Sequence, residues 1–201
     1  SDRLGGFGMS DIYFSVKNNE SWTTAKNMGP IINTRGNEVS PFYHAVFDVM
    51  YFSSNGQLYN FGAYDIYKSY KIGENWSEPI NIGPLVNGKG SEFYFTIDSE
   101  SKNLYYARST SSDLKKLDLY SFPLPMGARP DARARLIGSL RDSLTGQTFG
   151  GIVSVIDMDD GIEVAPKYLK RDGTFEFDLI DQRNYLLVIQ GDDFFRIEQA
   201  F

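Results

Sequence analysis

Two aspartates, Asp11 and Asp65, are the residues best suited to chemistry, because a pair of carboxylates is what most glycosidases use to cleave sugars. Asp65 follows Asp11 by 54 residues, and each aspartate begins the same tripeptide, Asp-Ile-Tyr. Glu38 and Glu92 recur at the same interval. Acids in equivalent positions of a repeat usually serve the repeat itself. We therefore expect all four to accept hydrogen bonds from the turns of their own repeats, which is a structural role.

Other residue types that support catalysis or metal binding are scarce. His44 is the only histidine, so neither a multi-histidine zinc site nor a histidine pair can form within the chain, and a Ser-His-Asp arrangement would have to use this residue. The chain has no cysteine, which excludes disulfides and thiolate metal sites. The glycines of residues 5–8 lack the Lys-Ser/Thr that follows a phosphate-binding loop, so a turn is expected there.

One acidic segment has the composition of a calcium loop. Residues 157–161 read Asp-Met-Asp-Asp-Gly, which is similar to the start of an EF-hand. The glycine comes one position early, and Tyr168 stands where the loop needs a bidentate acid. A turn is the favoured interpretation, and a weak surface cation site that includes Glu163 is the alternative.

Aromatic side chains suggest a groove for a carbohydrate or a peptide. In β-rich repeats such side chains more often pack between neighbouring sheets, so we favour packing over binding. Coplanar, exposed rings on one face would support the binding interpretation. The aromatics in question are Tyr43, Tyr59, Phe61, Tyr64 and Tyr70.

The acids belong to a longer repeat that positions them. Short β-branched and aromatic runs, bounded by Gly, Asn and Asp, predict strands. A period of about 40 to 50 residues built from such strands is typical of β-propeller blades. Each tryptophan is expected to pack between neighbouring blades. The matched positions are Asp11 and Asp65, Tyr13 and Tyr67, Trp22 and Trp76, Gly29 and Gly83, Asn33 and Asn87, and Glu38 and Glu92, with Asp118 and Tyr120 in a third, degraded copy.

The organisation along the chain follows from these repeats. Residues 1–122 hold about two and a half copies, so we expect a partial propeller, the C-terminal blades of a larger ring, and hence a fragment. Residues 123–133 are rich in proline and are expected to form a semi-stiff linker. Residues 134–201 hold four strand-like runs and an Asp172-Gly173 turn, which predict a small antiparallel β-sandwich. The predicted fold class is all-β.

Composition narrows the classes of partner. Hydrophobic residues make up 41% of the chain and aromatic residues 15%, which is enough for ordered cores. A net charge of −6 argues against binding nucleic acid or an anionic membrane through a general basic field. No apolar run is long enough for a membrane-spanning helix.

Both halves resemble known families. The repeats, with Phe-Gly-x-x-Asp-Ile-Tyr, Trp, Asn-x-Gly-Pro and Asn, are similar to TolB-like PD40 propeller repeats, a WD40-like class. The second half, with Asp142-Ser143-Leu144-Thr145-Gly146 and Asp172-Gly173-Thr174-Phe175, resembles the carboxypeptidase-regulatory, transthyretin-like sandwich. This combination resembles a family of Bacteroidota envelope proteins of the OmpA type, whose type IX secretion and gliding-associated members bind peptidoglycan through a further domain.

The resemblance implies a noncatalytic scaffold in the periplasm, associated with the outer membrane. Its implied partners are other envelope proteins, such as secretion or gliding components, and peptidoglycan, which a domain outside these residues would contact. We expect no catalytic residue, no cofactor, no metal, no nucleic acid and no transmembrane segment, and we expect the loops between strands to touch the partner. The alternatives are a carbohydrate-binding protein, a propeller glycosidase and a peptidase-associated propeller.

Overall fold

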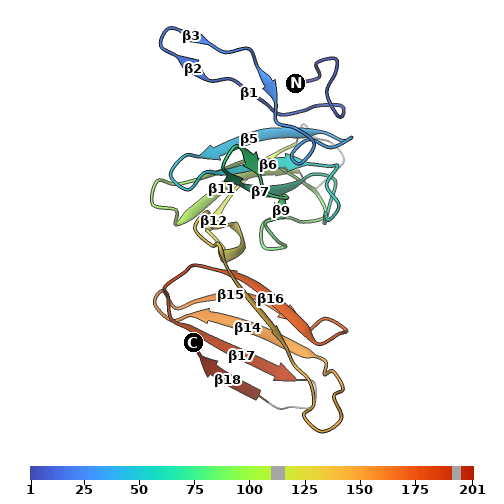
Figure 1. Cartoon of the computed structure of the whole chain (residues 1–201). Coiled ribbons are helices and arrows are strands. Elements are labelled where there is room, and N and C mark those ends of the chain that lie inside the picture. Colours follow the sequence, from blue (N-terminus) through green and yellow to red (C-terminus); the bar gives the residue numbers. More distant parts are fainter. Residues whose placement is uncertain (110–115, 192–195) are drawn as a thin grey trace. The chain divides into compact units, whose positions relative to one another are not determined.

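The computed structural model describes residues 1–109, 116–191 and 196–201. It is all-β, with eighteen strands and one 3₁₀ turn among these residues. The chain divides into two units, Ser1–Leu124 and Pro125–Phe201 (Figure 1). None of the sheets in the described residues closes on itself, and no helix there is long and apolar enough to cross a membrane.

The largest sheet of the first unit contains one whole copy of the repeat. Strands β5 (Glu38–His44), β6 (Val49–Ser54) and β7 (Asp65–Ile72) pair in order and antiparallel (Figure 1). The two-residue strand β9 (Ile80–Asn81) pairs with the middle of β7 and covers its outer edge. Strand β8 (Asn75–Trp76) pairs with the far end of β7.

The preceding copy supplies the equivalents of β7, β8 and β9. Strand β1 (Tyr13–Phe14) pairs with β4 (Lys26–Asn27), and a small hairpin of β2 (Lys17–Asn18) and β3 (Ser21–Trp22) lies between them in sequence. Tyr13 faces Asn27 as Tyr67 faces Asn81, so the backbone register repeats with the sequence.

The third copy forms a three-stranded sheet. Its strands β10 (Ser91–Ile97), β11 (Asn103–Ser109) and β12 (Asp118–Pro123) correspond to β5, β6 and β7. No strand of the described residues takes the place of β9 beside β12. The Tyr51 and Phe95 rings stack with their centroids 4.5 Å apart, which joins this sheet to the one before it.

Equivalent irregularities interrupt the first strand of each sheet. The register between β5 and β6 shifts between Val39 and Phe42, and that between β10 and β11 shifts between Phe93 and Thr96. Ser40 and Tyr94, which are 54 residues apart, have φ angles of 51° and 55° at these bulges. A positive φ is unfavourable for a non-glycine residue, so both bulges are strained.

The expected packing of the two tryptophans differs between them. Trp76 lies against a buried cluster that joins Ile12 and Ile32 of the first copy to residues of the second, so it packs between copies. Trp22 is 66% exposed, and the expectation is wrong for this residue. The reason is that its strand, β3, pairs only with β2 in the described residues.

The second unit has two sheets around one core. Strands β13 and β16 form one sheet, and β15, β14, β17 and β18 form the other in that order (Figure 1). Val153 and Val155 from the larger sheet share a buried cluster with Phe175 and Phe177 from the smaller. The bounds are β13 Ala134–Ser139, β14 Gly151–Asp157, β15 Ile162–Tyr168, β16 Thr174–Leu179, β17 Tyr185–Gly191 and β18 Arg196–Ala200.

The proline-rich segment is more ordered than a linker. Strand β12 continues to Pro123, and a 3₁₀ turn, η1, covers Met126–Ala128. Met126 and Ala132 are buried in the core cluster of the second unit, so most of residues 123–133 belongs to that unit. The sandwich expected from four strands also gains β15 and β18, which the sequence analysis did not predict.

Candidate functional site

Asp11 is fully engaged by its own copy. Its carboxylate accepts hydrogen bonds from the backbone N–H groups of Phe7 (2.7 Å) and Gly8 (3.1 Å). A third bond, of 2.7 Å, comes from Nδ2 of Asn27 on β4. Asp11 is 2% exposed, so this carboxylate ties the loop before β1 to the strand after it.

Asp65 repeats this arrangement in the second copy. It accepts bonds from the N–H groups of Phe61 (2.6 Å) and Gly62 (3.2 Å) and from Nδ2 of Asn81 (2.7 Å). It is completely buried. The two aspartates therefore hold separate turns, each within its own copy of the repeat.

A pair of asparagines completes each network. Oδ1 of Asn87 accepts the N–H of Ile66 at 2.8 Å, and Nδ2 of Asn87 donates to the carbonyl of Ile66 at 2.8 Å. Nδ2 of Asn87 also donates to Oδ1 of Asn81, which in turn accepts the N–H of Gly83. Asn33 makes the corresponding bonds in the first copy, to Ile12 and to Asn27. One side chain thus satisfies the outward-facing backbone groups of the strand, as a neighbouring strand would.

Two positions in each copy require glycine, one because of its backbone conformation and one because another part of the chain lies close to it. Gly29 and Gly83 have φ angles of 88° and 95°, in the left-handed region that favours glycine. A Cβ on Gly62 would lie 2.3 Å from the carbonyl oxygen of Gly90, and a Cβ on Gly8 would meet the chain at the equivalent place. The glycines of residues 5–8 therefore belong to a tight turn, as expected.

Glu38 is buried with a full set of donors. Its carboxylate accepts bonds from the N–H of Thr34 (2.8 Å), from Oγ1 of Thr34 (2.6 Å) and from Oγ of Ser54 (2.7 Å). It is 1% exposed. This acid joins the loop before β5 to the end of β6, so it too is structural.

Glu92, the equivalent acid, has different partners. Gly88 stands in place of Thr34, and Arg108 stands in place of Ser54. Nε of Arg108 donates to Oε1 of Glu92 at 2.8 Å, and the same guanidinium donates to the carbonyl of Val86. Oε2 has no hydrogen bond of normal geometry in the described residues, although the nearby Gly88 N–H lowers the pKa. Burial outweighs these effects and raises the pKa of Glu92 above its ordinary value.

The repeated tyrosine, Tyr67 in the second copy, is hydrogen-bonded to the loop before its own strand. The hydroxyl of Tyr67 donates to the carbonyl of Tyr59 at 2.6 Å, and burial raises the pKa of Tyr67 to about 12. The phenol therefore stays protonated at neutral pH. Tyr13 lies on β1 at the equivalent position, and Arg3 lies over its ring.

Asp118 and Tyr120 show how far the third copy departs from the others. Both lie on β12, where Asp118 is exposed and Tyr120 is half-buried and stacked on Tyr106. Unlike Asp11 and Asp65, Asp118 has no side-chain hydrogen bond to any described residue, since this copy has no equivalent of Asn81 at its edge.

The candidate groove aromatics differ in their exposure and in the rings that they contact. Tyr59 and Phe61 are exposed, whereas Tyr43 meets Trp76 edge-on, with 78° between the ring planes. Tyr64 packs on Phe93 at 46°. Tyr70, which lies at the end of β7 beside Lys68, is partly buried. These five side chains are therefore not uniformly buried between sheets.

A hollow lies next to the two bulges in the first unit. Its volume is about 280 Å³. Tyr94 is 65% exposed at the rim, where a ligand would meet its ring. Strained residues cluster at functional sites, and both bulge residues lie here. The lining residues are Val39, Ser40, Tyr64, Phe93, Tyr94 and Leu117.

The acidic segment 157–161 is a turn closed by protein cations. Asp157 accepts the N–H groups of Asp159 and Asp160, and Arg183 pairs with both Asp157 (2.8 Å) and Asp160. The Arg183 guanidinium lowers the pKa of Asp160, and hydrogen bonds from Asn184 lower the pKa of Asp159. No group of acids or histidines in the described residues could hold a metal, and Glu163 lies exposed on β15.

His44 ends β5 among aromatic rings. It contacts Phe42 edge-on and Phe47 at 5.3 Å between centroids. Its Nδ1 is buried and has no hydrogen-bond partner among the described residues.

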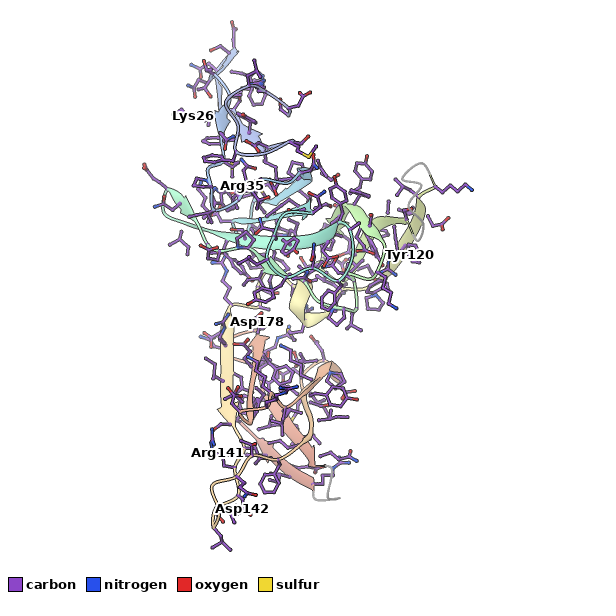
Figure 2. The ribbon with its side chains drawn as sticks, turned by 90° about the vertical axis from the view of Figure 1, so that its right-hand side faces the viewer. Lys26, Arg35, Tyr120, Arg141, Asp142 and Asp178 are labelled. Atoms are coloured by element: carbon purple, nitrogen blue, oxygen red, sulfur yellow. The ribbon has the colours of Figure 1, made fainter. Side chains whose placement is uncertain are left out.

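Three residues of these sites, Arg108, Ser40 and Tyr94, were not predicted from the sequence. Arg108 could have been found, because it replaces Ser54 at the repeat interval beside a buried acid. The bulges leave no signal in a single sequence, since neither Ser nor Tyr marks a positive φ. In the second unit, Asp142 caps a turn beside Arg141 (Figure 2) by accepting the N–H groups of Leu144 and Thr145.

No family model, no curated protein and no solved structure matches this chain.

Proposed function

We propose that the protein is a noncatalytic scaffold that binds other proteins, with residues 1–122 forming part of a β-propeller. The observation that carries this proposal is the repeated network around Asp11 and Asp65. In this network the acids most suited to catalysis accept hydrogen bonds that hold loops to strands. Such ties make a rigid framework whose loops are free to vary, which is the usual basis of binding by propellers.

The order of strands supports the propeller assignment. The sheet β5-β6-β7-β9 is a four-stranded antiparallel unit built from one repeat, and the next sheet packs against it through Tyr51 and Phe95. A propeller blade has this form. The two sheets of the second unit, with one shared core, support a transthyretin-like sandwich that would space the propeller from a further domain.

The cellular setting is proposed from the resemblance of the repeats and the second unit to envelope proteins of the OmpA type. In this proposal the protein lies in the periplasm at the outer membrane, binds secretion or gliding components, and reaches peptidoglycan through a domain outside residues 1–201. It acts without a cofactor.

The test is an affinity purification from the native envelope after mild cross-linking. The bait is the tagged protein expressed at its natural level, and the control is a tagged periplasmic protein of similar charge. Enrichment of outer-membrane secretion components and of peptidoglycan fragments over the control supports the proposal. A protein that fractionates with the cytoplasm, or that enriches no envelope component over the control, contradicts it.

Carbohydrate binding is the second candidate, and the exposed ring of Tyr94 at the hollow favours it. Aromatic rings stack on sugars, although the 47° angle between the Phe93 and Tyr94 planes allows only one ring to do so at a time. Titration with soluble peptidoglycan fragments tests it, because Tyr94→Ala should abolish any saturable binding while Tyr105→Ala leaves it unchanged.

A further inference from the structure

The outer edge of β12 differs from the same edge in the other two copies. In the second copy, residues 80–87 cover the edge of β7: Nδ2 of Asn81 donates to Asp65, and Asn87 pairs with both backbone groups of Ile66. The N–H of Ile82 also donates to the carbonyl of Ile66. The first copy covers β1 in the same way with residues 26–33. After β12 the chain instead enters the second unit.

The backbone of β12 has its free groups on that edge. The N–H of Leu124 donates to the carbonyl of Lys102, and Asp118, Tyr120 and Phe122 pair with β11 in the same register. Because hydrogen-bonding direction alternates along an antiparallel strand, the backbone groups of Leu119 and Ser121 point away from β11. No strand of the described residues pairs with them.

The exposure of the β12 side chains also shows that no described segment covers this edge. Leu119 takes the place of Ile66 and Ile12, which are 0% and 6% exposed, yet it is 80% exposed. Asp118 takes the place of Asp65 but is exposed, and no described residue donates a hydrogen bond to its carboxylate. Natural sheet edges are usually protected by lysine, proline or a bulge. Of these, β12 has only Pro123, at its end (Figure 2 labels Tyr120 on this strand).

We propose that the edge of β12 is a strand-addition site for a partner polypeptide that carries the pattern Asn-apolar-Gly-Pro followed by a second Asn three residues later. The chemistry of the occupant follows from the two covered copies. Its first Asn donates to the Asp118 carboxylate, its second Asn pairs with the backbone of Leu119, and its apolar residues cover the Leu119 side chain. The two covering segments of residues 26–33 and 80–87 already pair with β1 and β7, so neither of them is the occupant. This inference does not depend on the envelope location proposed above.

The binding test uses a labelled peptide with the sequence of residues 77–88, titrated with the whole chain and followed by fluorescence anisotropy. We expect saturable binding that weakens at least about tenfold, or about 1.4 kcal/mol, when both peptide asparagines become Ala. Asp118→Ala in the protein should weaken it similarly, whereas the charge-matched Asp2→Ala should not. The proposal is overturned if the peptide without its asparagines binds as tightly as the original peptide, or if the Asp118→Ala protein binds the original peptide as tightly as the unchanged protein. It is also overturned if no saturable binding is seen.

Amide hydrogen exchange locates the site without relying on a variant that folds. In the free protein the Leu119 and Ser121 amides should exchange quickly while the Ile66 amide is protected, and the peptide should slow only the former two on this edge. Protection of Leu119 in the free protein would show that the edge is already covered. Sedimentation should give a monomer, and a dimer that Asp118→Ala dissociates would make a second copy the occupant, against the proposal.

Discussion

At the scale of the residue, the same side chain has different surroundings in the three copies, and these differences predict its energetic role. Asp65 is buried and accepts two backbone N–H groups and an amide. Asp118, on β12, is exposed. Since a buried donor left without an acceptor costs about 1–3 kcal/mol, the same substitution should matter in one copy and not in another.

Asp65→Ala should lower the free energy of unfolding by about 3 kcal/mol, because it leaves the Phe61 and Gly62 N–H groups and the Asn81 amide without their acceptor. Asp118→Ala, the matched substitution, should change it by less than about 0.5 kcal/mol. Urea unfolding followed by tryptophan fluorescence measures both. Equal losses in the two variants would contradict the structural role of the repeated aspartate.

Glu92 should give the stability a specific pH dependence. Burial raises its pKa in the folded protein, so its contribution to stability is fully present below the unfolded pKa of about 4.3 and is lost as the pH rises through the folded pKa. Glu92→Gln should remove this loss. The stability of the variant relative to the wild type should therefore increase between acid and neutral pH. Urea unfolding across that range tests this, with the exposed Glu100→Gln as a control that leaves the profile unchanged. If the pH dependence of stability in Glu92→Gln ran parallel to that of the wild type, burial would not raise the pKa of the Glu92 carboxyl.

At the scale of the element, the strands with regular patterns were predictable and the irregular ones were not. The aromatic and β-branched runs of β7, β10, β11 and β16 gave correct strands. Strand β5 was missed because it contains Pro41 and a bulge, and β18 because all five of its residues are exposed. Pairing with a neighbouring strand, and not local preference, determines such segments. Asp11, Asp65 and Arg108 lie at repeat positions that the sequence makes visible, but the hollow depends on tertiary contacts.

The bulge at Tyr94 should carry strain that a different residue relieves. Its φ of 55° is unfavourable for Tyr and tolerated by Asn. Tyr94→Asn should therefore raise the free energy of unfolding by about 0.5–1 kcal/mol, since little packing is lost from an exposed ring. Tyr105→Asn, on the regular strand β11, should lower it. A loss of stability in Tyr94→Asn equal to that in Tyr105→Asn would argue that the bulge is unstrained.

At the scale of the whole molecule, two cores lie in two units, and each should respond to its own substitutions. Both tryptophans, Trp22 and Trp76, belong to the first unit, so their fluorescence monitors that unit alone. Far-UV circular dichroism follows the strands of both. This separation lets one sample report on two unfolding events.

Gly138→Ala should destabilise only the second unit. A Cβ at Gly138 would lie 2.2 Å from the Phe175 ring, which is buried in that core, and such overpacking costs about 1–3 kcal/mol. We expect an earlier transition by circular dichroism and an unchanged midpoint by tryptophan fluorescence. A shift of the fluorescence midpoint by the same amount would mean that the chain unfolds as a single cooperative unit.

The most direct test of the scaffold account is electron cryomicroscopy of the protein purified with its partners from the native envelope. The account predicts that the β5-β6-β7-β9 sheet and the β10-β11-β12 sheet are successive blades of one ring, with partner protein density at the loops and an added strand along β12. Sheets outside any closed ring, or a ring whose loops hold no partner, would contradict it.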